Sequence, residues 1–136
     1  MEKFSLEIIT PERVMVRQDV DMVEAPGTAG EFGVLPGHVA FLSTLEHGEI
    51  RFMVDGAARF IATSGGFVEV LENNVVFLLD TAEFAEEVDV MRAERAKERA
   101  EARLKGLSLE QQEYDAFQTA LMRAITRISV AAKTGG

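Results

Sequence analysis

Cysteine is absent from the 136-residue chain, and this absence removes several kinds of chemistry together. Without thiols there are no disulfides, no thiolate metal site and no cysteine nucleophile. Long apolar runs are also missing, since the longest, Val75–Leu79, is far too short to span a bilayer. Residues 1–5 lack the basic end and the apolar stretch of a signal peptide. We therefore expect a soluble, cytoplasmic protein.

Histidine is nearly as scarce, which leaves few candidates for catalysis. The chain has two histidines, His38 and His47. No local signature makes a base and nucleophile of His38 and Ser43, and His47 with Glu49 has no evident third metal ligand. Gly65-Gly66 lacks the lysine and the following helix of a phosphate-binding loop, so we interpret it as a turn between strands. The sequence predicts neither an enzyme nor a metal centre.

Basic residues are scarce only in the first part of the chain. Residues 1–85 hold five basic and fourteen acidic side chains, a net charge of −9, whereas residues 86–136 hold nine of each. An acidic surface repels phosphate backbones, so we expect no nucleic-acid partner. Because the two parts differ in charge balance, we predict two domains with different roles, 1–85 and 86–136.

The first part consists of short apolar runs bounded by Gly, Pro, Asn or Asp. The alternating run Ile50–Val54 meets Asp55-Gly56, a strong signal for a two-residue hairpin turn. A second hairpin is predicted at Glu72-Asn73-Asn74, which separates Phe67–Leu71 from Val75–Leu79. Many short strands with no helix between them indicate a β-sandwich or a flattened barrel.

The segment Gly30–His38 combines three glycines and a proline with large apolar side chains. Glycine accepts positive φ without a Cβ clash, and Pro36 fixes its own φ. We therefore expect a sharply bent loop outside regular structure. Leu35 and Leu42 are predicted to anchor this loop in the sandwich core.

From Glu86 onward the sequence is typical of helices, because proline is absent and charged residues with high helix propensity separate the apolar ones. Gly106 is placed to end a first helix, and Ser108–Gln111 has the pattern of a capping box that begins a second. The apolar positions are Val88, Met91, Ala93, Ala96, Ala100 and Leu104 in the first helix, and Tyr114, Phe117, Leu121, Ile125 and Ile128 in the second. The short connection predicts an antiparallel hairpin.

Arginines recur on the predicted first helix at steps of three, four and four. They are Arg92, Arg95, Arg99 and Arg103. Two further arginines, Arg123 and Arg127, lie four residues apart on the second helix. Charged runs are usually solvated helix faces; the functional alternative is a site for anions or acidic surfaces, which guanidinium groups suit. Because the first helix offers mainly alanine for burial, a partner or ligand could shift the hairpin.

Motifs along the whole chain resemble the epsilon subunit of the bacterial F-type rotary ATP synthase. They are Leu35-Pro36-Gly37-His38 within Gly30–Gly48, Thr63–Val70, Asp80-Thr81-Ala82, Asp89-x-x-Arg92-Ala93 and Arg127–Val130. The resemblance implies a ten-stranded β-sandwich followed by an α-helical hairpin. It also implies a non-catalytic central-stalk subunit that couples proton-driven rotation to ATP synthesis, peripheral to the membrane on the cytoplasmic face of the bacterial inner membrane.

The same resemblance implies partners and contact residues. The sandwich would bind the gamma subunit through Thr10, His38 and Ser43, and the c subunits of the membrane rotor ring through Glu31. The hairpin, when extended, would reach the alpha/beta catalytic head and restrain ATP hydrolysis.

Some bacterial members of that family bind ATP in the hairpin, as a regulatory ligand and not as a required cofactor. The matching residues here are Asp89, Arg92, Ala93, Arg99, Arg123 and Arg127. Ala116 stands where those members place another arginine. We expect the affinity to be weaker by tenfold or more, because one charge-assisted hydrogen bond contributes about 1.5–3 kcal/mol. A freestanding module that senses ATP is the alternative function.

Overall fold

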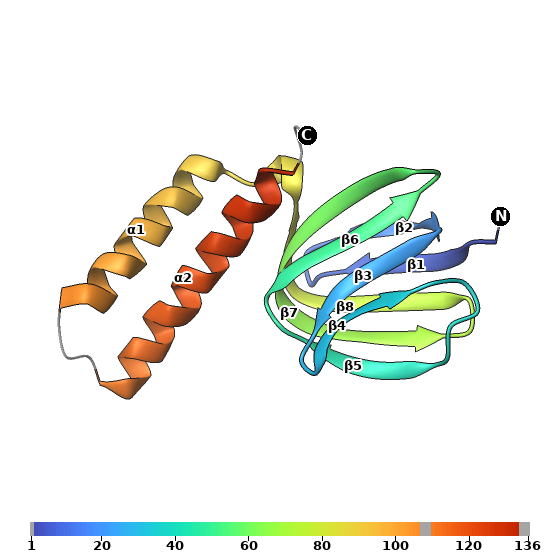
Figure 1. Ribbon diagram of the computed structural model, residues 1–136, viewed down its shortest axis with the longest axis horizontal. Helices are drawn as coiled ribbons and strands as arrows, with labels where there is room; N and C mark the ends of the chain where they lie inside the picture. The colour runs from blue at the N-terminus through green and yellow to red at the C-terminus, as the bar shows by residue number, and fades with distance from the viewer. Residues whose placement is uncertain (1, 107–109, 134–136) are drawn as a thin grey trace. The chain divides into compact units, whose positions relative to one another are not determined.

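The computed structural model describes residues 2–106 and 110–133. The chain forms two units, and the boundary between them in the sequence falls between Phe84 and Ala85 (Figure 1). Eight strands form the first unit within the described residues. They are β1 (Phe4–Ile9), β2 (Val14–Val20), β3 (Met22–Gly27), β4 (Gly30–Val34), β5 (Phe41–Leu45), β6 (Gly48–Val54), β7 (Ala57–Leu71) and β8 (Asn74–Phe84). The second unit contains a 3₁₀ turn, η1 (Ala85–Glu87), and two helices, α1 (Val90–Gly106) and α2 (Gln111–Ala131).

The strands form two layers because β7 and β8 are long enough to take part in both. The first half of β7 pairs with β6, and its second half pairs with β5. The first half of β8 pairs with β1, and both halves pair with β7. One layer therefore runs β2-β1-β8-β7-β5 and the other β4-β3-β6-β7-β8. The predicted sandwich is confirmed, and the expected ten strands are obtained by counting β7 and β8 once in each layer.

The two long strands bend where their register shifts, at Thr63–Gly66. Gly65 and Gly66 have φ values of +122° and +148°, which residues with a Cβ rarely adopt. The Thr63 hydroxyl donates to the Thr81 carbonyl (2.9 Å) and accepts from the Gly65 amide (3.1 Å). The prediction of a turn between strands at Gly65-Gly66 is wrong. The pair forms a bulge within one continuous strand, because the glycines and Thr63 let the chain bend without ending the ladder.

Both predicted hairpins are confirmed. Asp55 and Gly56 have φ values of +51° and +83°, as a two-residue type I′ turn requires, and they join β6 to β7. The second turn consists of Glu72 and Asn73, since Leu71 pairs directly with Asn74.

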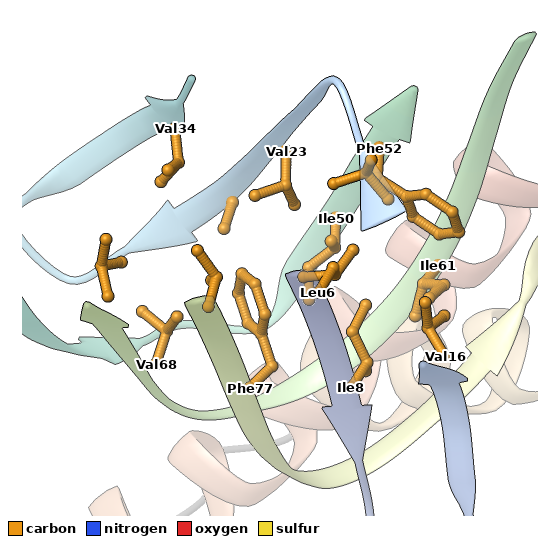
Figure 2. Close-up of a cluster of buried hydrophobic side chains, with 14 of the residues drawn as sticks. Leu6, Ile8, Val16, Val23, Val34, Ile50, Phe52, Ile61, Val68 and Phe77 are labelled. Carbon is orange, nitrogen blue, oxygen red and sulfur yellow. The ribbon is translucent and has the colours of Figure 1, made fainter. Parts of the chain in front are cut away.

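The core lies between the two layers, and Figure 2 shows its side chains converging from both. In β1, Phe4, Leu6 and Ile8 are buried, and the residues between them are partly exposed, because successive side chains of a strand point to opposite faces. Phe52 and Phe77 are the largest fully buried side chains. Each large apolar side chain buried in this way contributes about 1.5–3 kcal/mol to folding.

The segment Gly30–His38 differs from the prediction in two respects. Its first five residues are not irregular but form β4, which pairs with β3 from Val34↔Val23 to Gly30↔Gly27. The predicted anchors are also wrong, since Leu35 and Leu42 are 59% and 69% exposed. Val34 is buried instead, and Phe32 packs against the core, because the register of β4 points these side chains inward.

The second unit is the predicted antiparallel hairpin, with α1 and α2 side by side (Figure 1). The Asp89 carboxylate accepts a hydrogen bond from the Arg92 amide at 3.0 Å and so caps the start of α1. The predicted alanine face is confirmed at Ala93 and Ala100, which are buried. The capping box predicted at Ser108 lies outside the described residues.

The apolar face predicted for α2 is only partly correct. Tyr114 and Ile125 are exposed, whereas Ala124 and Val130 are buried. Phe117, Leu121 and Ile128 are partly buried. Alanines on α1 allow the helices to approach closely, so the fully buried part of α2 is narrow.

Candidate functional site

The four predicted interface residues come from three parts of the sandwich. Glu31 is exposed on β4, and His38 is exposed in the loop between β4 and β5. Ser43 is half-buried on β5, where its hydroxyl donates to the Thr44 carbonyl at 2.9 Å. Thr10 is buried at the end of β1.

The loop between β4 and β5 rests on aromatic rings. The ring of Phe41 lies edge-on to that of Phe32, with 5.2 Å between the centroids, and the His38 ring lies 5.5 Å from Phe41. The His38 amide donates to the Leu35 carbonyl at 3.2 Å, which closes the turn at Pro36-Gly37. Aromatic pairs of this geometry contribute about 0.5–1.5 kcal/mol beyond their buried area. The stack therefore holds His38 and Leu35 in position at the surface.

Large apolar side chains also gather on the outer face of the layer β2-β1-β8-β7-β5. Phe67 pairs with Leu78, and Leu78 pairs with Ile9, so the three form a row across β7, β8 and β1. Leu71 and Leu42 lie on the same face, since Leu71 follows the buried Val70 and Leu42 follows Phe41, which packs against the core. We call Ile9, Leu42, Phe67, Leu71 and Leu78 the outer apolar face.

The sequence analysis missed the outer apolar face. The available signal was the unbroken run Val75–Leu79, because strands that are covered on both faces are apolar throughout instead of alternating. Phe67 and Leu78 are 46% and 41% exposed in the chain alone. Glu69 is exposed on the same face, between Phe67 and Leu71 along β7, so one carboxylate interrupts the apolar side chains. A cluster of exposed apolar side chains bordered by polar residues marks an interaction surface.

Thr10 shapes the turn between β1 and β2. Its hydroxyl accepts hydrogen bonds from the amides of Glu12 (3.3 Å) and Arg13 (3.2 Å), and its own amide donates to the Arg13 carbonyl at 2.9 Å. The hydroxyl is therefore bonded within the turn, and the exposed residues there are Pro11 to Val14.

A charged network joins three separate segments of the sandwich at its surface. Lys3 Nζ lies 3.0 Å from Asp21 and 2.8 Å from Asp55, and the second Asp21 oxygen accepts from the Asp55 amide at 2.6 Å. The hydrogen bond from Lys3, with that from the Asp55 amide, holds the pKa of Asp21 below its ordinary value. The hydrogen bonds to Asp55 and Asp21 raise the pKa of Lys3. This network stabilises the fold near the β6–β7 turn.

The six residues predicted to hold ATP fall into two groups. Asp89 caps α1 and Ala93 is buried, so the structure accounts for both by folding alone. Arg92, Arg99 and Arg123 are exposed, and Arg127 is half-buried. Arg99 follows Arg92 by seven positions, so the two lie about 10 Å apart along α1.

The arginines on α1 are not equivalent. Arg92, Arg95 and Arg99 make no side-chain hydrogen bond or ion pair with any other described residue. The Arg103 guanidinium lies 5.1 Å from the centre of the Phe117 ring on α2, so it forms a cation–π contact within the hairpin. The first three are the guanidinium groups available to an anion or an acidic surface.

The described parts of the chain contain neither a candidate metal site nor a candidate membrane-spanning helix. Over residues 2–106 and 110–133, no three His, Asp or Glu side chains are grouped so as to hold a metal ion. No helix there has the length and apolarity needed to cross a membrane.

A two-layer β-sandwich continued by a helical hairpin defines a two-domain class of protein, and comparison with family models divides the chain in the same way. Residues 3–85 match the ATP synthase, Delta/Epsilon chain, beta-sandwich domain. Residues 86–132 match the ATP synthase, Delta/Epsilon chain, long alpha-helix domain. The chain belongs to the ATP synthase Delta/Epsilon chain family, and the resemblance seen in its motifs is confirmed.

Individual relatives agree over nearly the whole length. The chain is 48% identical over 133 residues to the ATP synthase epsilon chain of Syntrophobacter fumaroxidans, covering 98% of each. It is 45% identical over 131 residues to that of Nitratidesulfovibrio vulgaris, covering 96% of this chain and 97% of the relative.

Among solved structures, a chain of the Euglena gracilis mitochondrial ATP synthase OSCP/F1/c-ring structure has a TM-score of 0.71 at 20% identity, covering 96% of this chain and 78% of that one. A chain of the Tetrahymena thermophila mitochondrial ATP synthase central stalk/c-ring structure has a TM-score of 0.64 at 15% identity, covering 99% and 98%. At these identities the likeness establishes the fold.

Proposed function

We propose that the chain is a non-catalytic central-stalk subunit of a proton-translocating ATP synthase, located at the cytoplasmic face of the bacterial inner membrane. In this role the sandwich couples rotor rotation to ATP synthesis, and the hairpin restrains ATP hydrolysis. Family membership and the epsilon-chain relatives support the role. The observation that carries it is the outer apolar face, which a stalk partner would cover.

We assign the outer apolar face to the gamma subunit. Leu42 lies beside Ser43 on β5, and the loop that presents His38 leads directly into that strand, so these features form one continuous segment. Covering large apolar side chains removes their surface from water, at about 25 cal/mol per Å². This burial supplies the attraction that a permanent subunit contact requires.

Glu31 suits a different partner, the c subunits of the rotor ring. It pairs with Pro26 near the end of the β3–β4 hairpin and is exposed. A charge on such a tip steers association and fixes register more than it adds affinity. We therefore expect Glu31 to contact polar or basic loops.

The hairpin fits a regulatory role because little apolar surface joins its helices. The fully buried residues of α1 are alanines, each of which contributes only about 0.8 kcal/mol for its methyl group. Its position is therefore decided by small free energies, which a partner can supply. The exposed arginines of α1 would then contact acidic surfaces of the alpha/beta head.

The assignment to gamma is tested by reconstitution of the full chain with purified gamma subunit. We expect Leu78→Glu to lower the affinity at least about tenfold, because it places a charge in the apolar contact. Ala58→Glu is the matched control, since Ala58 is exposed on the half of β7 that belongs to the other layer. Equal binding by wild type and Leu78→Glu would overturn the assignment.

A second candidate function is the binding of ATP as a regulatory ligand, favoured by the guanidinium groups of Arg92 and Arg99, which pair with no other residue that the structure describes. Titration calorimetry of the isolated chain with ATP tests it. Binding that is lost in Arg92→Ala and Arg123→Ala but kept in Arg17→Ala would support an ATP-sensing hairpin. Absence of heat at millimolar ATP would leave the stalk role alone.

A further inference from the structure

The sandwich ends in an aromatic residue that two arginines contact. Phe84 is the last residue of β8, packs against the core and pairs with Ile61 of β7. The guanidinium carbon of Arg59 lies 4.1 Å from the centre of the Phe84 ring, and that of Arg13 lies 5.8 Å from it. Cations at these distances are attracted by the quadrupole of the ring. We call Arg13, Arg59 and Phe84 the aromatic clasp.

The two arginines of the clasp come from different layers. Arg59 lies in the half of β7 that pairs with β6, and its guanidinium carbon is also 6.0 Å from the ring of the core residue Phe52. Arg13 lies in the turn between β1 and β2, which belong to the other layer. The Phe84 ring therefore connects the two layers at the point where the chain leaves the sandwich.

Thr10 sets the position of Arg13. The Thr10 hydroxyl accepts hydrogen bonds from the amides of Glu12 and Arg13, and the Thr10 amide donates one to the Arg13 carbonyl. These bonds fix the backbone of Arg13 relative to β1. A change in this turn therefore changes the contact between Arg13 and Phe84. Thr10 acts here as a positioning residue.

Phe84 is bonded directly to Ala85, where the second unit begins. Ala85 begins η1, and its carbonyl accepts a hydrogen bond from the Val88 amide at 3.3 Å. We call residues 85–88, which follow Phe84, the hairpin root. We propose that the aromatic clasp holds the hairpin root in place, so that the β1–β2 turn controls how easily the backbone of these residues unfolds locally. A partner that binds the turn and draws Arg13 away would loosen the hairpin root. This regulatory part rests on the proposed function.

Hydrogen exchange of the full-length chain tests the clasp directly. We expect Arg13→Gln and Phe84→Leu each to speed amide exchange across residues 85–88 by about two- to fivefold, the equivalent of one exposed cation–π contact. Arg13→Lys, which keeps the cation, should restore most of the protection. Arg17→Gln is the matched control, because Arg17 on β2 pairs with Glu7 and contacts no aromatic ring among residues 2–106 and 110–133.

A variant in the turn distinguishes coupling from local packing. Thr10→Val removes the hydroxyl acceptor but keeps the shape, and we expect it to speed exchange at residues 85–88 as well as at Glu12 and Arg13. Thr10→Ser should behave like wild type. The double variant Thr10→Val with Phe84→Leu should exchange no faster at residues 85–88 than Phe84→Leu alone, since both changes break the same contact.

The outcomes separate the clasp from the proposed function. Unchanged exchange at residues 85–88 in Arg13→Gln, or an additive double variant, would overturn the clasp. Hydrolysis by the reconstituted synthase tests the regulatory role independently, by comparing the full chain with a chain that lacks residues 87–136. An effect of the deletion without an effect of Arg13→Gln on exchange would refute the clasp alone, whereas the reverse would refute the regulatory role alone.

Discussion

Gly66 of β7 lies so close to Leu78 of β8 that a Cβ at Gly66 would collide with the Leu78 carbonyl oxygen. The contact occurs at the bulge where both long strands pass from one layer to the other. The obstacle is backbone, so no side-chain rotation can relieve it.

Gly66→Ala is therefore expected to destabilise the sandwich by about 2–3 kcal/mol or more, through backbone displacement in addition to an unfavourable φ. Urea unfolding of the full chain measures this loss. Gly37→Ala is the control, because Gly37 also has positive φ (+81°) but has open space around the missing Cβ. A loss at Gly66 no larger than at Gly37 would contradict the role of the Leu78 carbonyl.

The network of Lys3, Asp21 and Asp55 predicts a dependence of stability on pH. Because Lys3 holds the folded-state pKa of Asp21 below its ordinary value of 3.8, the stabilisation is fully present above about pH 4 and is lost as pH falls through the lower, folded-state pKa. Asp21→Asn should be less stable than wild type at pH 7, and the difference should shrink below pH 4. Thermal unfolding between pH 2.5 and 7 measures it.

Asp19→Asn provides the control for this pH dependence, since Asp19 is exposed on β2 and makes no ion pair with another described residue. It should follow the wild-type profile. A constant difference between Asp21→Asn and wild type across the whole range would show that the network does not act through the charge of Asp21.

The sandwich is expected to fold without the hairpin. The hydrophobic core cluster is formed by strand residues from Phe4 to Leu79, so deletion of residues 87–136 removes none of its members. The truncated chain should unfold cooperatively in urea, with far-ultraviolet circular dichroism typical of strands. A non-cooperative transition would show that the hairpin contributes to the core.

The features that the sequence predicted correctly are those determined by neighbouring residues. The Asp55-Gly56 turn follows from two residues that tolerate positive φ, and the hairpin of α1 and α2 follows from propensity and spacing. These signals act over a few residues, so one sequence suffices to detect them. The ten-stranded sandwich itself came with the family resemblance.

The features that the sequence did not reveal depend on register between distant strands. Leu35 and Leu42 were expected in the core because they are apolar, but β5 is set by its pairing with β7, which points Leu42 outward. In the sequence alone, the bulge at Gly65-Gly66 has the pattern of a turn. It is not one, because β7 continues through it and stays paired with the distant strand β8. The aromatic clasp likewise joins residues 13, 59 and 84, which no local pattern connects.

The continuity of β7 and β8 through both layers has a mechanical consequence. In a sandwich whose layers share no strand, side-chain contacts alone resist sliding of one sheet over the other. Here two covalent backbones cross from the layer that carries the outer apolar face to the layer that carries β4 and Glu31. A force applied to one face must therefore stretch the backbone or break its strand pairing before one layer can slide over the other. The sandwich thus transmits force between partners bound to its two faces with little internal deformation.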